Sequence, residues 1–238
     1  NGQPAAMRLV TWIGGTPLAE APRSLDQLAN LGRFMGGLAR SMQGFGHPQA
    51  FRPDFPWSLD HVIQLKDHAE DIADPTRRDL VKRLFTRYET QILPHLPKLR
   101  ASVLHQDAND WNVITDAADQ TRIAGLIDFG DMCHGRTVNE LAITLAYALL
   151  DTPDLYAATR ALITGFAAEF PLTEDEAEMI VDALEADMEG YLESAKEARG
   201  NANRADVATF SEAAERIGAL IAKVRALLDF LAQEKSGR

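Results

Sequence analysis

The chain has 238 residues, of which 46% are hydrophobic and 25% charged, a composition typical of a folded globular protein with a sizeable core. Acidic residues outnumber basic ones 35 to 24, and the formal net charge of −11 argues against broad electrostatic binding to nucleic acid or anionic membranes. The single cysteine excludes an internal disulfide framework, and the most apolar stretch, residues 141–150, is too short to cross a bilayer. We therefore expect a cytoplasmic protein with no nucleic-acid or membrane partner, whose acidity would suit a small cationic substrate.

The beginning of the chain predicts one strand followed by one helix. Residues 7–13 have the composition of a strand, which the Gly14-Gly15 turn and Pro17 would end. Ser24-Leu25-Asp26-Gln27 has a capping-box pattern, and leucine and methionine recur at steps of three and four as far as Met42. This spacing predicts an amphipathic helix with one face in the core.

The next segment predicts a loop and two further helices. Residues 44–57 contain three prolines and two glycines, which favour an irregular crossing loop. Helices are expected near 58–71 and 75–93. Asp74-Pro75 is a good start for the second of them, because aspartate caps a helix and proline suits its first turn.

The second half of the chain predicts a hairpin followed by helices. Strand signals at 112–115 and 122–127, separated by a polar turn, predict a β-hairpin. Everything after Asn139 is expected to be helical, with a capping box at Thr173–Glu176. A last helix carries apolar residues at steps of three and four from Phe210 to Leu231, which is typical of an internal packing face and, alternatively, of a self-association surface.

Three polar side chains near the hairpin predict a site for chemistry. Asp107 and Asn112 lie five residues apart before the first strand, and Asp128 directly follows the second. If the strands pair, these side chains meet in one pocket. Two carboxylates and an amide oxygen form the hard oxygen set that Mg²⁺ accepts while it keeps water and phosphate ligands. The alternative without chemistry is an ordinary polar hairpin, since turns favour aspartate and asparagine. The residue types and spacing of Asp107, Asn112 and Asp128 favour phosphoryl transfer instead.

These residues also carry a family resemblance. His105-Gln106-Asp107 with Asn112, followed by Asp128-Phe129-Gly130, resembles the catalytic loop and metal-binding turn of small-molecule kinases in the aminoglycoside phosphotransferase and choline kinase superfamily. Within that superfamily, HQDANDWNV and GLIDFGDM are most similar to hydroxylysine-kinase-like phosphotransferases. The resemblance is strong over residues 103–150 and weak beyond about residue 155.

The resemblance implies a role for each of these residues. Asp107 would accept or orient the proton of the substrate hydroxyl as it attacks the terminal phosphate of ATP or GTP, while Asn112 and Asp128 would hold Mg²⁺. His105 would brace the loop. Gln106 stands where the family most often has glycine, so its side chain must be housed there. Two further carboxylates, Asp131 and Glu140, either orient the catalytic loop, cap a helix or lie at the surface.

The resemblance also implies that the nucleotide-binding elements of the family are missing from this sequence. Kinases of this type cradle the nucleotide with a glycine-rich strand-turn-strand and a lysine, but this sequence has no such turn and no lysine before Lys66. RLVTWIGGTPL resembles the family's linker between lobes, with the backbone of Thr11, Trp12 and Ile13 facing the nucleotide base. We therefore expect a mainly α fold with a small β-hairpin (α+β): the C-terminal lobe of a protein-kinase-like fold, lacking most of the N-terminal nucleotide lobe and weakly active or inactive alone.

The expected organisation divides the chain at residue 20. Residues 1–20 would be a hinge strand and linker left from the N-terminal lobe, and residues 21–238 a helical substrate and catalytic lobe. Within that lobe, 103–132 would form the catalytic loop and metal turn, and 137–234 the C-terminal helices.

The favoured function is a kinase that phosphorylates a hydroxyl of a small amine-bearing substrate such as a hydroxylated amino acid, amino alcohol or aminoglycoside. The helix expected over 173–199 carries ten acidic residues, which would suit such a cation or merely form a solvated face. The alternative is a non-catalytic, kinase-derived binding or self-association module, either a homodimer or the partner of a missing N-terminal lobe. A metal-dependent phosphohydrolase is a weaker third reading.

Overall fold

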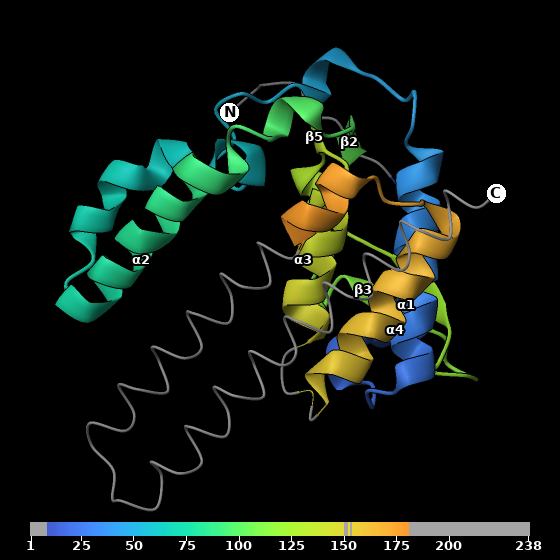
Figure 1. Ribbon diagram of the computed structural model, residues 1–238. Helices are drawn as coiled ribbons and strands as arrows, with labels where there is room; N and C mark the ends of the chain where they lie inside the picture. Colours follow the sequence, from blue (N-terminus) through green and yellow to red (C-terminus); the bar gives the residue numbers. More distant parts are fainter. Residues whose placement is uncertain (1–8, 150–151, 153, 181–238) are drawn as a thin grey trace, which may run out of the picture.

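The computed structural model of the protein describes residues 9–149, 152 and 154–180. Over these residues the fold is mainly helical, with two small antiparallel sheets (Figure 1), as the sequence predicts. In the described part of the chain, no helix is both long and apolar enough to cross a membrane.

Helix α1 (Leu25–Ser41) begins as its capping box predicts. The Ser24 hydroxyl accepts a hydrogen bond from the Gln27 amide at 3.1 Å, which satisfies one of the free N–H groups of the first turn. The predicted apolar stripe is buried, with Leu28, Leu31 and Met35 almost completely removed from solvent. This face therefore lies in the main core.

Helix α4 (Leu155–Glu169) lies against α1 along much of its length (Figure 1). Glycines let the two backbones approach. A Cβ added at Gly32 would lie 2.1 Å from the Leu162 carbonyl oxygen, and one at Gly165 would lie 2.1 Å from the Ala29 carbonyl oxygen. Any side chain at either position would push the two helices apart.

The predicted hairpin is confirmed. Strands β3 (Val113–Thr115) and β4 (Ile123–Leu126) pair in antiparallel fashion, and β1 (Thr16–Pro17) adds to the free edge of β3. The sequence did not predict the second sheet, in which β2 (Ala101–Leu104) pairs with β5 (Cys133–Arg136). Their sequences, Ala-Ser-Val-Leu and Cys-His-Gly-Arg, contain only one β-branched or aromatic residue, Val103, and so lack the composition that predicts a strand. Residues 105–112, which contain the candidate site residues Asp107 and Asn112, therefore connect the two small sheets.

The predicted strand at residues 7–13 is wrong over its described part. Residues 9–13 form no strand, and Leu9 and Trp12 are 100% and 93% exposed, so their apolar side chains have no core to face. Pairing begins instead at β1, and Pro17 lies within that edge strand rather than after it. Gly15 permits this approach, because a Cβ there would lie 2.0 Å from the Thr115 carbonyl oxygen.

Residues 59–92 form an arm that projects from the helical body (Figure 1). It consists of the 3-10 helix η3 (Leu59–Asp71), α2 (Pro75–Arg87) and the π-helical turn η4 (Tyr88–Ile92). The two helices predicted near 58–71 and 75–93 are thus confirmed in position, although the first is 3-10 rather than α. Asp74 caps α2 as expected, accepting a hydrogen bond from the Arg77 amide at 3.1 Å.

The remaining connections contain only short 3-10 turns. The crossing loop at 44–57 is irregular as predicted, with one 3-10 turn, η2 (Pro48–Ala50), and further 3-10 turns are η1 (Leu18–Glu20), η5 (Leu96–Lys98) and η6 (Phe129–Asp131). Helix α3 (Asn139–Ala148) follows the second sheet.

The capping box at Thr173 is confirmed. The Thr173 amide donates to Glu176 Oε2 at 2.9 Å, and the Glu176 amide donates to the Thr173 hydroxyl at 3.3 Å. The rest of the acidic helix and the predicted apolar stripe at 210–231 lie outside the described residues.

Candidate active site

Asp107 and Asn112 are joined directly. The Asn112 side-chain amide donates to Asp107 Oδ2 at 2.8 Å and to the Asp107 carbonyl oxygen at 2.9 Å. Both bonds use the side-chain nitrogen, so the Asn112 side-chain oxygen takes no part in this contact. Two of the three predicted site residues therefore meet as expected.

Asn109 binds the second oxygen of the Asp107 carboxylate, a role that the sequence analysis did not predict. Its side-chain nitrogen donates to Asp107 Oδ1 at 2.8 Å, and its side-chain oxygen accepts from the amides of Trp111 and Asn112 at 2.9 and 3.1 Å. Asparagine side chains commonly accept hydrogen bonds from backbone amides two or three residues further along the chain. The presence of an asparagine at position 109 could therefore have indicated this turn. The half-buried Asp107 is thereby fixed in one orientation.

Asp128 stands at the same end of the hairpin. The Ile127 amide donates to the Asn112 carbonyl oxygen at 2.9 Å, so the backbones next to both candidate metal ligands are bonded to each other. Asp128 itself adopts a left-handed conformation with φ of 62°, its side chain accepts from the Gly130 amide at 3.2 Å, and it is exposed. Strain of this kind concentrates at functional sites.

His105 is bonded both to the loop at Asp107 and to the backbone directly before Asp128. It is fully buried, its Nδ1 accepts from the Asp107 amide at 3.2 Å, and its Nε2 bonds to the Ile127 carbonyl oxygen at 2.9 Å. Burial lowers the pKa of His105, although the Ile127 carbonyl and the carboxylates of Asp107 and Asp128 oppose this shift. A neutral ring with its proton on Nε2 satisfies both bonds, which supports a bracing role rather than proton transfer.

Glu140 orients the catalytic loop, one of the roles that the sequence left open. Its Oε1 accepts the Gln106 amide at 2.8 Å, and the residue is 2% exposed. Burial raises the pKa of Glu140 to about 7, against hydrogen bonds from the Gln106 and His105 amides that lower it. The buried carboxyl therefore holds the backbone just before Asp107.

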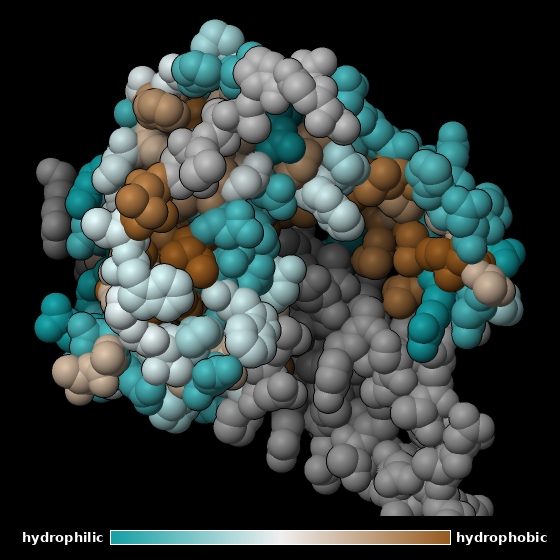
Figure 2. All heavy atoms as spheres, turned by 180° about the vertical axis from the view of Figure 1, so that it is seen from behind, coloured by the Kyte–Doolittle hydropathy of each residue, from teal (hydrophilic) through white to brown (hydrophobic). Residues whose placement is uncertain are grey.

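A cavity of about 660 Å³ opens beside Asp107, between the arm and α3. Its wall on the arm is largely apolar, and Figure 2 shows apolar side chains gathered on this part of the molecule. Its polar lining includes Gln106, Asp107 and Asp131 from the loops at the hairpin, and Arg87 from the arm. A concave, mostly apolar site with a few convergent polar groups is the usual form of a small-molecule pocket.

The sequence pattern of the phosphotransferase enzyme family matches residues 1–178. The chain belongs to this family. Hydroxylysine kinase from Xenopus laevis is 30% identical over 185 residues, covering 73% of this chain and 50% of that protein. Hydroxylysine kinase from Mus musculus is 27% identical over 179 residues, covering 71% and 48%. The chain thus spans about half the length of the curated relatives it matches.

Solved structures of the family share the fold. An aminoglycoside phosphotransferase from Alicyclobacillus acidocaldarius superposes with a TM-score of 0.56 at 16% identity, covering 92% of this chain and 70% of that one. Another from Streptomyces rimosus, solved with ADP and streptomycin, gives a TM-score of 0.52 at 21% identity, covering 74% and 67%. These likenesses confirm the predicted fold class.

The oxygen donors fit the magnesium ion that phosphotransferases use. In the described part of the chain, no three histidine, cysteine, aspartate or glutamate side chains group to hold a metal ion. The predicted set has two carboxylates, Asp107 and Asp128, and one amide, Asn112. The hydrogen bonds of Asn112 to Asp107 use its nitrogen and not its oxygen. Such a sparse set suits Mg²⁺, which keeps water and phosphate oxygens among its ligands.

The linker predicted to face the nucleotide base lies next to the hairpin. Ile13 packs on β4, where a Cβ added at Gly125 would lie 2.7 Å from Ile13 Cδ1. Thr11 and Trp12 are exposed. Farther along, the Ala19 amide donates to the carbonyl oxygen of Asp110 in the catalytic loop at 2.9 Å. The nucleotide role of residues 11–13 stays a prediction.

Two further carboxylates have structural roles that the sequence did not reveal. Asp60 anchors the base of the arm, because it accepts from the Asn139 side chain at 2.8 Å and from the Arg136 amide at 3.1 Å. Glu176, grouped by sequence with the acidic helix face, is fully buried and paired with Arg100. It therefore faces neither solvent nor a substrate. The sequence pattern does not distinguish Asp60 from a surface acid, and it marks Glu176 only as part of the capping box, not as buried.

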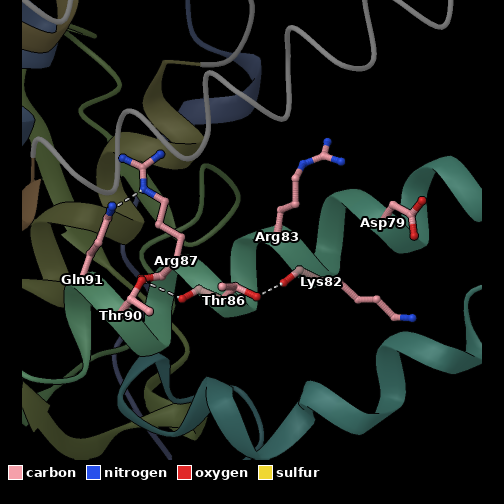
Figure 3. A pocket seen from close by; sticks show the side chains of 7 residues that line it. All are labelled: Asp79, Lys82, Arg83, Thr86, Arg87, Thr90 and Gln91. Atoms are coloured by element: carbon pink, nitrogen blue, oxygen red, sulfur yellow. Dashed lines mark hydrogen bonds between the residues drawn. The ribbon is translucent and has the colours of Figure 1, made fainter.

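A second hollow, of about 720 Å³, lies on α2 away from the catalytic loop. Figure 3 shows its basic side chains leaving the helix in different directions, with Arg83 and Lys82 diverging. Lys82 pairs with Glu70 at 2.6 Å, and Arg87 donates to Gln91 at 2.9 Å. Because these charges do not converge, we assign no chemistry to this hollow.

Proposed function

We propose that the protein is a kinase that moves the terminal phosphate of a nucleoside triphosphate to a hydroxyl of a small amine-bearing substrate. The observation that carries this proposal is the Asp107 carboxylate, held by two asparagine amides in the lining of a cavity of about 660 Å³. A fixed carboxylate beside a cavity that can take a substrate is what a general base for a substrate hydroxyl needs.

The roles follow from this placement. Asp107 accepts the proton of the acceptor hydroxyl as that oxygen attacks phosphorus. Asn112 and Asp128 hold Mg²⁺, which neutralises phosphate charge when bound. The backbone of residues 11–13 receives the base of ATP or GTP. Catalysis then depends mainly on positioning and charge neutralisation.

The cavity offers a place for the acceptor. Its apolar wall suits a short aliphatic chain. The carboxylates in its lining, Asp60, Asp107 and Asp131, outnumber its one basic side chain, Arg87, and so favour an amine. The hydroxylysine kinases similar to this chain are named for an acceptor of this type. We therefore propose a hydroxylated amino acid or amino alcohol as the first acceptor to test.

The test is a phosphotransfer assay on the full-length natural protein. ATP and GTP are supplied separately with Mg²⁺ and with 5-hydroxylysine, ethanolamine or kanamycin, and labelled phosphate in the acceptor is measured. Asp107→Asn should lower kcat by about 100-fold or more, the scale of a general base. Asp119→Asn, at the exposed hairpin tip, is the matched control. Absence of transfer to every acceptor, or wild-type turnover by Asp107→Asn, would contradict the proposal.

The non-catalytic alternative is not favoured. It was based on the missing nucleotide-binding lysine and on the apolar stripe at 210–231, and the stripe lies outside the described residues. Membership of the phosphotransferase family and the ordered bonds at Asp107 both support chemistry instead.

A further inference from the structure

Gln106 has a backbone conformation that favours glycine. Its φ is 71°, and among the described residues only Asp128 shares a positive φ without being glycine. A glutamine here is strained, whereas glycine would adopt this conformation freely. The side chain is nevertheless retained and is 95% removed from solvent, since the residue is 5% exposed. Strain at a buried position points to contacts of the side chain that offset it.

The Gln106 side chain connects the catalytic loop to the crossing loop. Its Nε2 donates to the Trp57 carbonyl oxygen at 3.2 Å, and its Oε1 lies 3.8 Å from the buried Cys133 thiol. Its own backbone amide is held by Glu140, so one end of the connection is fixed. Trp57 is the last residue of the crossing loop, and this bond ties it to the residue next to Asp107.

Trp57 forms part of the wall of the cavity. It lines the cavity together with Gln106 and Asp107, and it is 72% exposed, so little packing of its own side chain holds it in place. Farther upstream, Arg52 donates to the Gly130 carbonyl oxygen at 3.1 Å and holds that part of the loop. Loss of the Gln106 bond would therefore release mainly the residues next to the cavity.

We propose that Gln106 is a positioning residue that sets the cavity wall at Trp57 relative to Asp107 and thereby determines the affinity for the acceptor. This inference rests on the proposed function, since it assigns the cavity to the acceptor. A cavity lined by both an indole and carboxylates suits an amine, which the face of an indole attracts. The nucleotide lies on the linker side of the hairpin, so its affinity should not depend on Gln106.

Two variants of the full-length natural protein separate the bond from the strain. Gln106→Gly removes both the bond and the strain, and Gln106→Ala removes the bond alone. Both should raise the KM for the acceptor about fivefold to tenfold, the range expected for one lost hydrogen bond, with kcat and nucleotide KM within about twofold. Gln106→Gly should also have the higher melting temperature of the two. Gln64→Ala is the matched control, because Gln64 donates to the Pro53 carbonyl of the same loop at 3.3 Å but is exposed.

Amide hydrogen exchange over residues 50–58, measured without ligands, tests the bond between Gln106 and Trp57 independently of turnover. Faster exchange in both Gln106 variants but not in Gln64→Ala, together with the raised acceptor KM, is the expected result. Unchanged exchange, or an unchanged acceptor KM, would overturn the role of Gln106. If the wild-type protein phosphorylates no acceptor, the proposed function fails and the positioning role falls with it, while the exchange result still reports the bond itself.

Discussion

The catalytic end of the molecule and the arm are stabilised in different ways. From Ser102 to Gln106 every residue is buried, and the loop that follows is held by amide and carboxylate bonds. In the arm, residues 59–92, Ala69 is the only buried residue among the described side chains, and exposed ion pairs join its helices.

This difference fits the proposed function. If Asp107 is the general base, its geometry must be fixed, because a small misplacement costs much of the rate. An arm with few buried contacts is easily altered. Under the proposal, chemistry would be fixed at Asp107, while acceptor choice would lie in the arm and the crossing loop.

The largest expected effect on stability is at the catalytic end. Arg100, directly before β2, donates to the fully buried Glu176 carboxylate, with Nε 2.8 Å from Oε1. Arg100→Ala leaves that carboxylate without its cation and should lower the free energy of unfolding by about 3 kcal/mol or more. Urea denaturation measures this, and a loss below about 1 kcal/mol would show that this end is not held as described.

Glu140 gives the catalytic end a pH dependence. Its pKa is about 7 when folded and 4.5 in the reference state, so the folded protein binds the extra proton between these values. Stability should therefore fall as pH rises from about 5 to 7, by up to about 1.4 kcal/mol per pH unit. Glu140→Gln, which resembles the protonated form, should remove this slope. Parallel stability curves for the two proteins would contradict the assignment.

The smallest expected effect is in the arm. Lys66 and Glu89 pair at 2.5 Å between η3 and η4, with side chains 45% and 37% exposed. Lys66→Ala should change the free energy of unfolding by less than about 0.5 kcal/mol, because exposed ion pairs contribute little. A loss comparable to that of Arg100→Ala in the same urea experiment would erase the contrast between the two regions.

Local signals in the sequence predicted the elements that depend on local chemistry. The Ser24, Asp74 and Thr173 caps act through side chains within three residues of the helix start, so each is readable from a short stretch. The hairpin was predicted because its two strands are adjacent in sequence. The Asp107 and Asn112 contact followed from the same local reasoning.

Features that depend on distant partners were not predictable. The 28 residues 105–132 separate strand β2 from strand β5, and the two strands pair only because this intervening segment is folded. The strand expected at residues 7–13 failed over its described part because Leu9, Val10 and Trp12 are exposed and only Ile13 packs against the fold, on β4. Buried acids such as Glu140 and Glu176 resemble surface acids until their donors, Gln106 and Arg100, are brought beside them.

The central claim is that Asp107 and Asp128 act in one site. The direct test is a double-mutant cycle on the full-length natural protein, in which kcat for phosphotransfer is measured for Asp107→Asn, Asp128→Asn and the two combined. Residues that act as a unit are strongly non-additive, so the double variant should be little worse than the more damaged single variant. Losses that simply multiply would contradict a shared site.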